Sequence, residues 1–283
     1  MRFRDLPPIY ARLVGFVAGS IAQRLSPWTS AENCPTIRSA TEPLERVVAW
    51  VTPEPMKTGW ELATHCHAHS EPPVLIVPGF VGPSVLLRPL AMFLRLHDRH
   101  VKLVRTFPAL DGVVNHAQRI ADAVERLKAK TGAAQVDLVA HSMGGIAGRY
   151  YLLKMGGVAN VRRFITIATP HKGTNWAGFV VLGQSMKDLK PGNPLLAELA
   201  AAEKIKGVRS INIRAGWDQI VWPREHGMWG ADHAHEHELP FAEHWAVQAD
   251  PRLLALVLTS LEAPDEQPIE QDIARMEREA SGA

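Results

Sequence analysis

Residues 135–149, QVDLVAHSMGGIAGR, limit the possible folds of this chain more than any other part of the sequence. The short apolar run 136–140 has the pattern of a buried strand. His141, Ser142 and Met143 follow it directly, and a helix rich in small residues comes next. A strand that leads straight into a helix needs a sharp turn, and the residue at the apex of that turn is strained. The segment therefore predicts a strand–turn–helix with Ser142 at its apex.

The neighbours of Ser142 suit such a turn. The positions two before and two after the apex crowd each other, so they must be nearly free of side chain, and here they are Ala140 and Gly144. The Ser142 hydroxyl would then lie at the carboxyl-terminal edge of the sheet, above the positive end of the helix. An ordinary turn with a capping serine is the alternative. The flanking strand and glycine-rich helix favour a nucleophile elbow.

AHSMGG at 140–145 resembles the elbow of α/β-hydrolase lipases in which alanine replaces the first glycine. Further motifs resemble the bacterial triacylglycerol lipase and carboxylesterase group in order and spacing: VPGF at 77–80, TPHKGT at 169–174, AGWDQIVWP at 215–223 and EHWAVQADPRLL at 243–254. The resemblance covers about 72–261 and implies an α/β-hydrolase fold. Residues 1–70 show no such resemblance.

The order of predicted elements agrees with that fold. Apolar runs predict strands at 44–51, 59–64, 74–77, 101–105, 136–140, 164–168 and 208–213. Helical periodicity predicts helices at 83–96, 113–130 (with Gly132 as its stop), from the elbow to Lys154, and at 251–261. Strands that alternate with helices form a mostly parallel, doubly wound sheet with helices on both faces. We expect an N-terminal helix and connecting segment at 1–42 and one α/β-hydrolase domain at 43–283.

The net charge, the two cysteines and the N-terminal stretch bear on the binding partners and the cellular compartment of this chain. A net charge of +2 favours neither nucleic acid nor a strongly acidic partner. Cys34 and Cys66 are expected to be free thiols, although a disulfide between them stays possible. Arg2 and Arg4 before the apolar stretch 13–22 resemble a weak signal peptide. A helix packed on the body is favoured over a signal or a membrane-surface helix, so we expect a cytoplasmic protein, with export and lipid-interface contact as alternatives. The sequence does not indicate an oligomeric state.

A serine nucleophile needs a base, and the base needs a third group to orient it. In this fold the chain order is serine, acid, histidine. Asp218, just after the strand at 208–213, is the predicted acid, and a plain turn aspartate is its alternative. Glu225 and Asp232 are the next acids along the same loop.

Five histidines follow Asp218: His226, His233, His235, His237 and His244. The His-x-His-x-His run at 233–237 would suit a metal on an extended segment, but its intervening acids favour a solvated loop. His244 follows a predicted last strand and directly precedes the closing helix, so it is the predicted base. No metal or organic cofactor is expected.

The oxyanion of an acyl-transfer intermediate needs two fixed donors. The backbone N–H of Met143, next after the nucleophile, is one predicted donor. The second is the N–H of Phe80, in the loop where Gly79 lets the chain turn after the strand at 74–77. This loop lacks the HGGG form and matches the lipase-like alternative, VPGF.

The segment 174–206 is expected to form a lid or cap over the site. Its apolar residues Trp176, Phe179 and Leu182 would form a wall for an acyl chain, with ordinary core packing as the alternative. Thr169 to His171 is interpreted as structural, with His171 at the entrance as the alternative.

These residues predict a serine ester hydrolase of the lipase or carboxylesterase type, acting on a small acyl ester or lipid. An acyltransferase with the same three residues is one alternative, because an alcohol can replace water as acceptor. A catalytically silent binding protein of the same fold is another. A metal-binding histidine-loop protein is the third.

Overall fold

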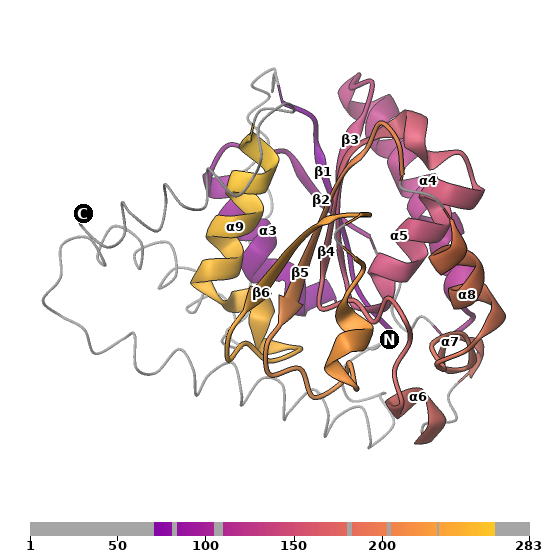
Figure 1. The fold of residues 1–283 in the computed structure, drawn as a ribbon. Helices are drawn as coiled ribbons and strands as arrows, with labels where there is room; N and C mark the ends of the chain where they lie inside the picture. The colour runs from indigo at the N-terminus through magenta and orange to yellow at the C-terminus, as the bar shows by residue number, and fades with distance from the viewer. Residues whose placement is uncertain are drawn as a thin grey trace, which may run out of the picture.

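The computed structural model describes residues 71–80, 84–104, 110–179, 183–202, 205–230 and 232–263. Its six-stranded sheet has the order β2-β1-β3-β4-β5-β6, and every neighbouring pair is parallel (Figure 1). The strands are β1 (Val74–Val77), β2 (Val101–Leu103), β3 (Val136–His141), β4 (Val161–Ile167), β5 (Arg209–Ala215) and β6 (His235–Leu239). The predicted N-terminal helix and the strands predicted at 44–51 and 59–64 lie outside the described residues.

Helices cover both faces of the sheet (Figure 1). On one face lie α3 (Arg88–Leu96) and α9 (Pro251–Glu262), and on the other lie α4 (Val113–Thr131), α5 (Met143–Lys154) and α8 (Pro194–Ala201). Two shorter helices, α6 (Trp176–Phe179) and α7 (Gly183–Asp188), follow β4, and short 3-10 helices are η3 (Ser84–Leu87), η4 (Gly157–Asn160), η5 (Arg224–Gly227) and η6 (Ala246–Ala249). The predicted doubly wound α/β architecture is confirmed. None of the described helices is both long and apolar enough to cross a membrane.

Alternate side chains of the inner strands enter two separate cores. In β1, Leu75 and Val77 join the core under α4 and α5, whereas Val74 and Ile76 join the core under α3 and α9. All four side chains are completely buried. A parallel strand covered on both faces must be apolar at every position, which explains why the inner strands show as unbroken apolar runs in the sequence.

The predicted element ends are mostly close to the observed ones. Gly132 ends α4 in the left-handed conformation, with φ of 74°, as expected for a C-terminal glycine. β4 begins at Val161, three positions before the prediction, and includes Arg163, whose guanidinium is buried against the backbone carbonyls of Leu261 and Ala263. A sequence pattern does not identify an arginine as a buried strand residue, because its hydrogen-bond partners lie far away in the chain.

The His-x-His-x-His run is not the solvated loop that the sequence favours. His235 and His237 lie in β6, which pairs in parallel with β5 at the edge of the sheet. Glu236 within the run and Glu238 directly after it stabilise this strand, because Arg214 of β5 forms ion pairs with them at 3.5 and 2.8 Å. β5 therefore continues through Arg214 to Ala215 instead of ending at residue 213.

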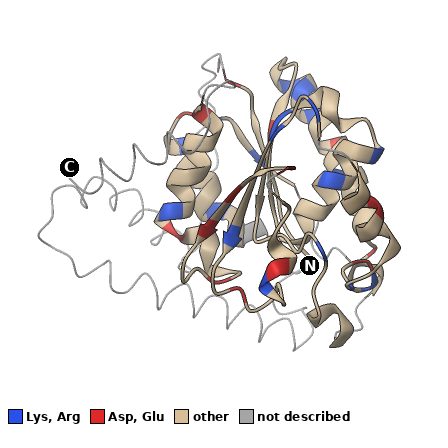
Figure 2. Cartoon of the chain, in the orientation of Figure 1, with Lys and Arg blue, Asp and Glu red and all other residues tan. Residues whose placement is uncertain are grey.

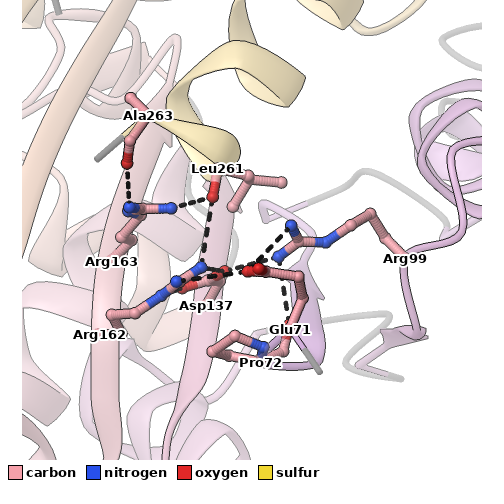
Figure 3. Close-up of polar contacts among 8 residues, drawn as sticks. All are labelled: Glu71, Pro72, Arg99, Asp137, Arg162, Arg163, Leu261 and Ala263. Atoms are coloured by element: carbon pink, nitrogen blue, oxygen red, sulfur yellow. Dashed lines mark hydrogen bonds and ion pairs between the residues drawn. The ribbon is translucent and has the colours of Figure 1, made fainter. Parts of the chain in front are cut away.

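A group of charged residues, termed here the arginine cluster, joins several elements at the amino-terminal edge of the sheet (Figure 3). It consists of Glu71, Arg99, Asp137, Arg162 and Arg163. Asp137 of β3 has no exposed surface and accepts hydrogen bonds from Arg99 Nη2 at 3.0 Å and Arg162 Nη2 at 2.7 Å. Elsewhere in the view of Figure 2, acidic and basic residues are interspersed over the ribbon.

Candidate active site

Ser142 occupies the sharp turn between β3 and α5. Its φ of 55° and ψ of −128° lie in a region that non-glycine residues rarely adopt, and such strain is typical of functional turns. Neighbouring backbone holds the turn in place, since the Ser142 N–H donates to the carbonyl of Ile167 at 2.8 Å. The Ser142 carbonyl in turn accepts from the Gly145 N–H at 2.9 Å. The elbow is therefore anchored to the end of β4.

Glycines let the chain approach this turn from two sides. A Cβ on Gly144 would lie 2.7 Å from the Pro78 carbonyl oxygen, and one on Gly145 would lie 2.1 Å from Thr169 Oγ1. The atoms nearest to a Cβ on Gly144 thus belong to Val77 and Pro78, at the end of β1, and not to Ala140, the residue predicted to crowd it. The small residues after Ser142 bring α5 into close contact with the ends of β1 and β4.

The loop after β1 passes directly over the nucleophile position. A Cβ on Gly79 would lie 2.7 Å from Ser142 Cβ and 3.2 Å from Ser142 Oγ, so no larger residue fits there without displacement. Phe80, the next residue, is buried. Met143 is the first residue of α5, and the first N–H groups of a helix have no acceptor within it. The residues proposed as oxyanion donors therefore flank Ser142.

The structure brings Ser142, His244 and Asp218 into one chain of hydrogen bonds. His244 Nδ1 lies 2.8 Å from Asp218 Oδ2, and His244 Nε2 lies 3.0 Å from Ser142 Oγ. Because a carboxylate only accepts, Nδ1 carries the proton, which leaves Nε2 free to accept from the serine hydroxyl. The imidazole of His244 has no exposed surface. The serine, imidazole and carboxylate have the arrangement of a serine hydrolase triad.

Asp218 is both a turn residue and the partner of the imidazole. Its Oδ1 accepts from the backbone N–H groups of Ile220 and Val221 at 2.8 and 2.7 Å, while Oδ2 faces His244. Burial acts to raise the pKa of Asp218, but His244 and the two N–H groups outweigh it and lower the pKa below the ordinary aspartate value. The carboxylate is therefore fixed and charged. The next acids along the loop, Glu225 and Asp232, are exposed.

His171 does not line an entrance. Its side chain is buried, with Arg149 Nη1 donating to Nδ1 at 3.2 Å and Nε2 donating to Asn212 Oδ1 at 3.2 Å. The ring stacks on Trp229 with 4.8 Å between centroids. Burial, followed by the nearby Arg149, lowers the pKa of His171 well below its ordinary value. The first interpretation, a structural role, fits this position.

Aromatic side chains are exposed around the edge of the sheet that holds Ser142. Trp176 and Phe179 follow β4, Trp217 and Trp222 follow β5, and Phe241 follows β6; these five residues are termed the aromatic rim. The carboxyl ends of parallel strands meet at one edge, so the rim residues follow strands that end at the same edge as Ser142. Phe179 is 81% exposed, which is unusual for a large apolar side chain in the described region. Leu182, the third residue predicted to bind substrate, lies outside the described residues.

Sequence reasoning missed His141 and Gln248, which lie behind the triad. His141 Nε2 is 3.0 Å from the His244 carbonyl oxygen, and Gln248 is within reach of the His141 ring. The position of His141 beside Ser142 is the one signal that pointed to it. Among the described residues, no group of three or more His, Cys, Asp or Glu side chains is arranged to hold a metal ion.

Comparison with known proteins agrees with the lipase motifs. The palmitoyl protein thioesterase family matches residues 91–206. A triacylglycerol lipase from Burkholderia plantarii is 30% identical over 129 residues, which cover 42% of this chain and 35% of the relative. The chain thus spans about a third of that curated relative. The similarity to bacterial triacylglycerol lipases that the motifs indicate is confirmed.

Solved structures establish the fold class. Aspergillus fumigatus lipase B superposes with a TM-score of 0.61 at 14% identity, covering 90% of this chain and 84% of that one. The mature form of Bacillus licheniformis lipase BlEst2 gives a TM-score of 0.57 at 15% identity, covering 74% of this chain and 96% of that one. The chain has the α/β-hydrolase fold.

Proposed function

We propose that this protein is a serine hydrolase that cleaves lipid-like carboxylic esters through an acyl-enzyme intermediate. The observation that supports this most directly is the unbroken path from Asp218 through His244 to Ser142, with contacts of 2.8 and 3.0 Å. The path ends on a strained elbow at the end of a central strand. An ordinary turn serine needs neither the strain nor the oriented imidazole.

In the first half-reaction Ser142 Oγ attacks the ester carbonyl carbon while His244 Nε2 takes the hydroxyl proton. Asp218 stabilises the imidazolium that forms and keeps its orientation. When the tetrahedral intermediate collapses, the bond to the alcohol oxygen breaks and His244 returns the proton to that oxygen. Water then attacks the acyl-serine by the same route, which releases the carboxylic acid and restores Ser142.

The backbone N–H groups of Phe80 and Met143 are the proposed oxyanion donors. They flank Ser142 on the β1 loop and at the start of α5, where fixed donors can stabilise negative charge on the carbonyl oxygen. The start of α5 adds the positive end of a helix dipole. Backbone donors held by folded elements need no rearrangement during the reaction.

An acyl substrate is proposed from the apolar surroundings of the site. Trp176 and Phe179 on α6 remain the proposed acyl-chain contacts, and their rings pack edge to face at 6.5 Å. Tryptophan favours boundaries between apolar and aqueous phases, so contact of the aromatic rim with a lipid surface is part of the proposal. A lid function for the segment 174–206, which holds α6, α7 and α8, stays a prediction. The names of the relatives, triacylglycerol lipase and palmitoyl protein thioesterase, support an ester or thioester of a fatty acid.

The test is hydrolysis of a chain-length series of p-nitrophenyl esters by the full chain and by Ser142→Ala. We expect activity in the wild type and a loss in the variant on the order of 10⁶ in kcat. A matched long-chain thioester reveals whether the thioester bond is preferred, and added alcohol reveals acyl transfer as a transesterified product. Full activity in a folded Ser142→Ala variant would refute the proposal.

A further inference from the structure

A second buried histidine lies directly behind the proposed base. His141 is the last residue of β3, and its side chain is almost completely buried. Its Nε2 lies 3.0 Å from the backbone carbonyl oxygen of His244, 103 positions later in the chain. A carbonyl oxygen only accepts hydrogen bonds, so His141 Nε2 carries a proton and donates it. The link joins a central strand to the peptide group of the base itself.

The segment that follows His244 holds the His141 ring in place. With Nε2 protonated, Nδ1 is the ring nitrogen that can accept a hydrogen bond, and the side-chain amide nitrogen of Gln248 lies 3.5 Å from it. The rings of His244 and Trp245 lie 4.9 and 5.8 Å from it, centroid to centroid. His141, His244 and Gln248 are all buried. The ring therefore has one well-defined orientation, with its N–H directed at the His244 carbonyl.

The surroundings keep His141 neutral. Burial lowers its pKa to about 3, and the nearby His244 contributes in the same direction. His141 therefore stays uncharged when His244 takes up a proton during the reaction, and it does not compete for that proton. A neutral, fixed donor can orient its partner without changing charge.

His244 needs such an anchor because of where it lies. It belongs to the irregular stretch between β6 and η6, and no strand or helix fixes its backbone. Its imidazole must nevertheless stay within hydrogen-bond distance of two groups on different loops. An error of about 1 Å in such an arrangement can lower turnover on the order of a hundredfold.

We propose that His141 is a positioning residue, whose Nε2–H fixes the His244 peptide group and so holds the imidazole between Ser142 and Asp218. The proposal rests on the proposed function for its kinetic consequence. It assigns His141 no contact with substrate. Its alternative is a purely structural role, in which His141 only fills space in the core.

The sharpest test compares two amide side chains at this position, His141→Gln and His141→Asn. A glutamine amide nitrogen can take the place of Nε2 and reach the His244 carbonyl, whereas an asparagine amide is one methylene shorter and falls near Nδ1. We expect His141→Asn to lower kcat about tenfold to a hundredfold with little change in KM, and His141→Gln to recover most of this loss. His141→Phe, which keeps a ring but has no donor, should behave like His141→Asn.

Tyr151→Phe serves as the matched control for general loss of a buried hydrogen bond. Tyr151 is buried in α5, and its hydroxyl accepts from Asn160 Nδ2 at 3.3 Å, away from the triad. Rates are compared well below the melting temperature of each variant. We expect Tyr151→Phe to lower the melting temperature while kcat stays at the wild-type value.

A readout independent of turnover separates this inference from the proposed function. The NMR resonance of the His244 Nδ1 proton reports its hydrogen bond to Asp218 in wild type and variants. We expect it to weaken or shift in His141→Asn and to stay near its wild-type position in His141→Gln. Wild-type kcat and an unchanged resonance in folded His141→Asn would overturn the inference, as would equal losses in the two amide variants. Wild-type protein without ester hydrolysis would refute the proposed function alone.

Discussion

Asp218 and Asp137 are aspartates with buried side chains at opposite edges of one sheet, and their partners differ. Asp218 lies at the carboxyl edge, where it faces one imidazole and two backbone N–H groups. Asp137 lies at the amino edge in the arginine cluster, where Arg99 and Arg162 face it. A guanidinium keeps its proton in a folded protein, whereas an imidazole gains and loses one near neutral pH. Of these two buried carboxylates, only Asp218 is therefore paired with a group that can transfer protons.

The two carboxylates also titrate in opposite directions. Burial raises the pKa of Asp137, and the opposing effects of Arg162, Arg163 and Arg99 do not cancel this rise. At Asp218 burial has the same sign, but His244 and two N–H groups outweigh it and lower the pKa. His244, together with the backbone N–H groups of the turn, thus keeps the Asp218 carboxylate charged although it is buried. The comparison indicates that the number of charged residues around a buried carboxylate does not by itself identify the candidate active site.

The largest expected effect concerns the histidines. His244→Ala should lower kcat about as severely as the loss of the serine, on the order of 10⁶, because serine and histidine act as one unit. Simultaneous replacement of His233, His235 and His237 should change kcat by less than about tenfold, because two of these residues belong to the edge strand β6 and none belongs to the triad. The two variants, once shown to be folded, are compared by their kcat for hydrolysis of p-nitrophenyl butyrate. An active His244→Ala with an inactive triple variant would move the base to β6.

The next effect separates the two aspartates directly. Asp218→Asn should lower kcat by about three to four orders of magnitude, because the imidazole is then held in the wrong tautomer. Asp137→Asn should leave kcat unchanged. It should instead lower the free energy of unfolding by about 3 to 5 kcal/mol, since it leaves the buried Arg99 and the partly exposed Arg162 without their carboxylate. Denaturant unfolding and turnover are measured for both variants. If Asp218→Asn and Asp137→Asn lowered kcat equally, the proposed difference in role between the two aspartates would be wrong.

The smallest effect is on the pH dependence of stability. A carboxyl with a lowered folded pKa stabilises the protein above its unfolded pKa, and this contribution is lost as pH falls through the folded pKa. Asp218→Asn should therefore make stability fall less steeply on the acid side than in wild type. Asp137 has a raised pKa and the opposite sign, so Asp137→Asn should make the fall steeper. Urea unfolding across the acid range measures both slopes, and slopes that change in the same direction would contradict the assigned shifts.

The inner part of the fold could be predicted because its signals are local. A strand buried on both faces must be apolar throughout, and a glycine such as Gly132 marks the end of its own helix. The Ser142 turn is visible for the same reason, since the residues that permit it lie beside it in the chain. A last strand before His244 was predicted, but its residues were interpreted as a solvated loop, because Glu236 and Glu238 fit a strand only once Arg214 is known to lie opposite them.

The site could be predicted only in part. The sequence left open whether Asp218 is a turn residue or the acid that orients the histidine. In the structure, Oδ1 accepts the turn hydrogen bonds and Oδ2 faces His244. His141 was overlooked because nothing near it in sequence reveals that it faces the His244 carbonyl. The exposed rim residues Trp217, Trp222 and Phe241 are scattered over two loops, so no single pattern collects them. Local sequence patterns do not reveal contacts between loops that are far apart in the chain.

The central claim is that Ser142 is an activated nucleophile. The most direct measurement is stoichiometric reaction of the full chain with a fluorophosphonate, followed by mass spectrometry of the intact protein and its peptides. We expect one phosphonyl group per chain, attached to the peptide that contains Ser142, and no labelling of Ser142→Ala. Labelling should also be strongly slowed in His244→Ala, because the serine then lacks its base. Undiminished labelling of Ser142→Ala, or attachment to another residue, would contradict the account.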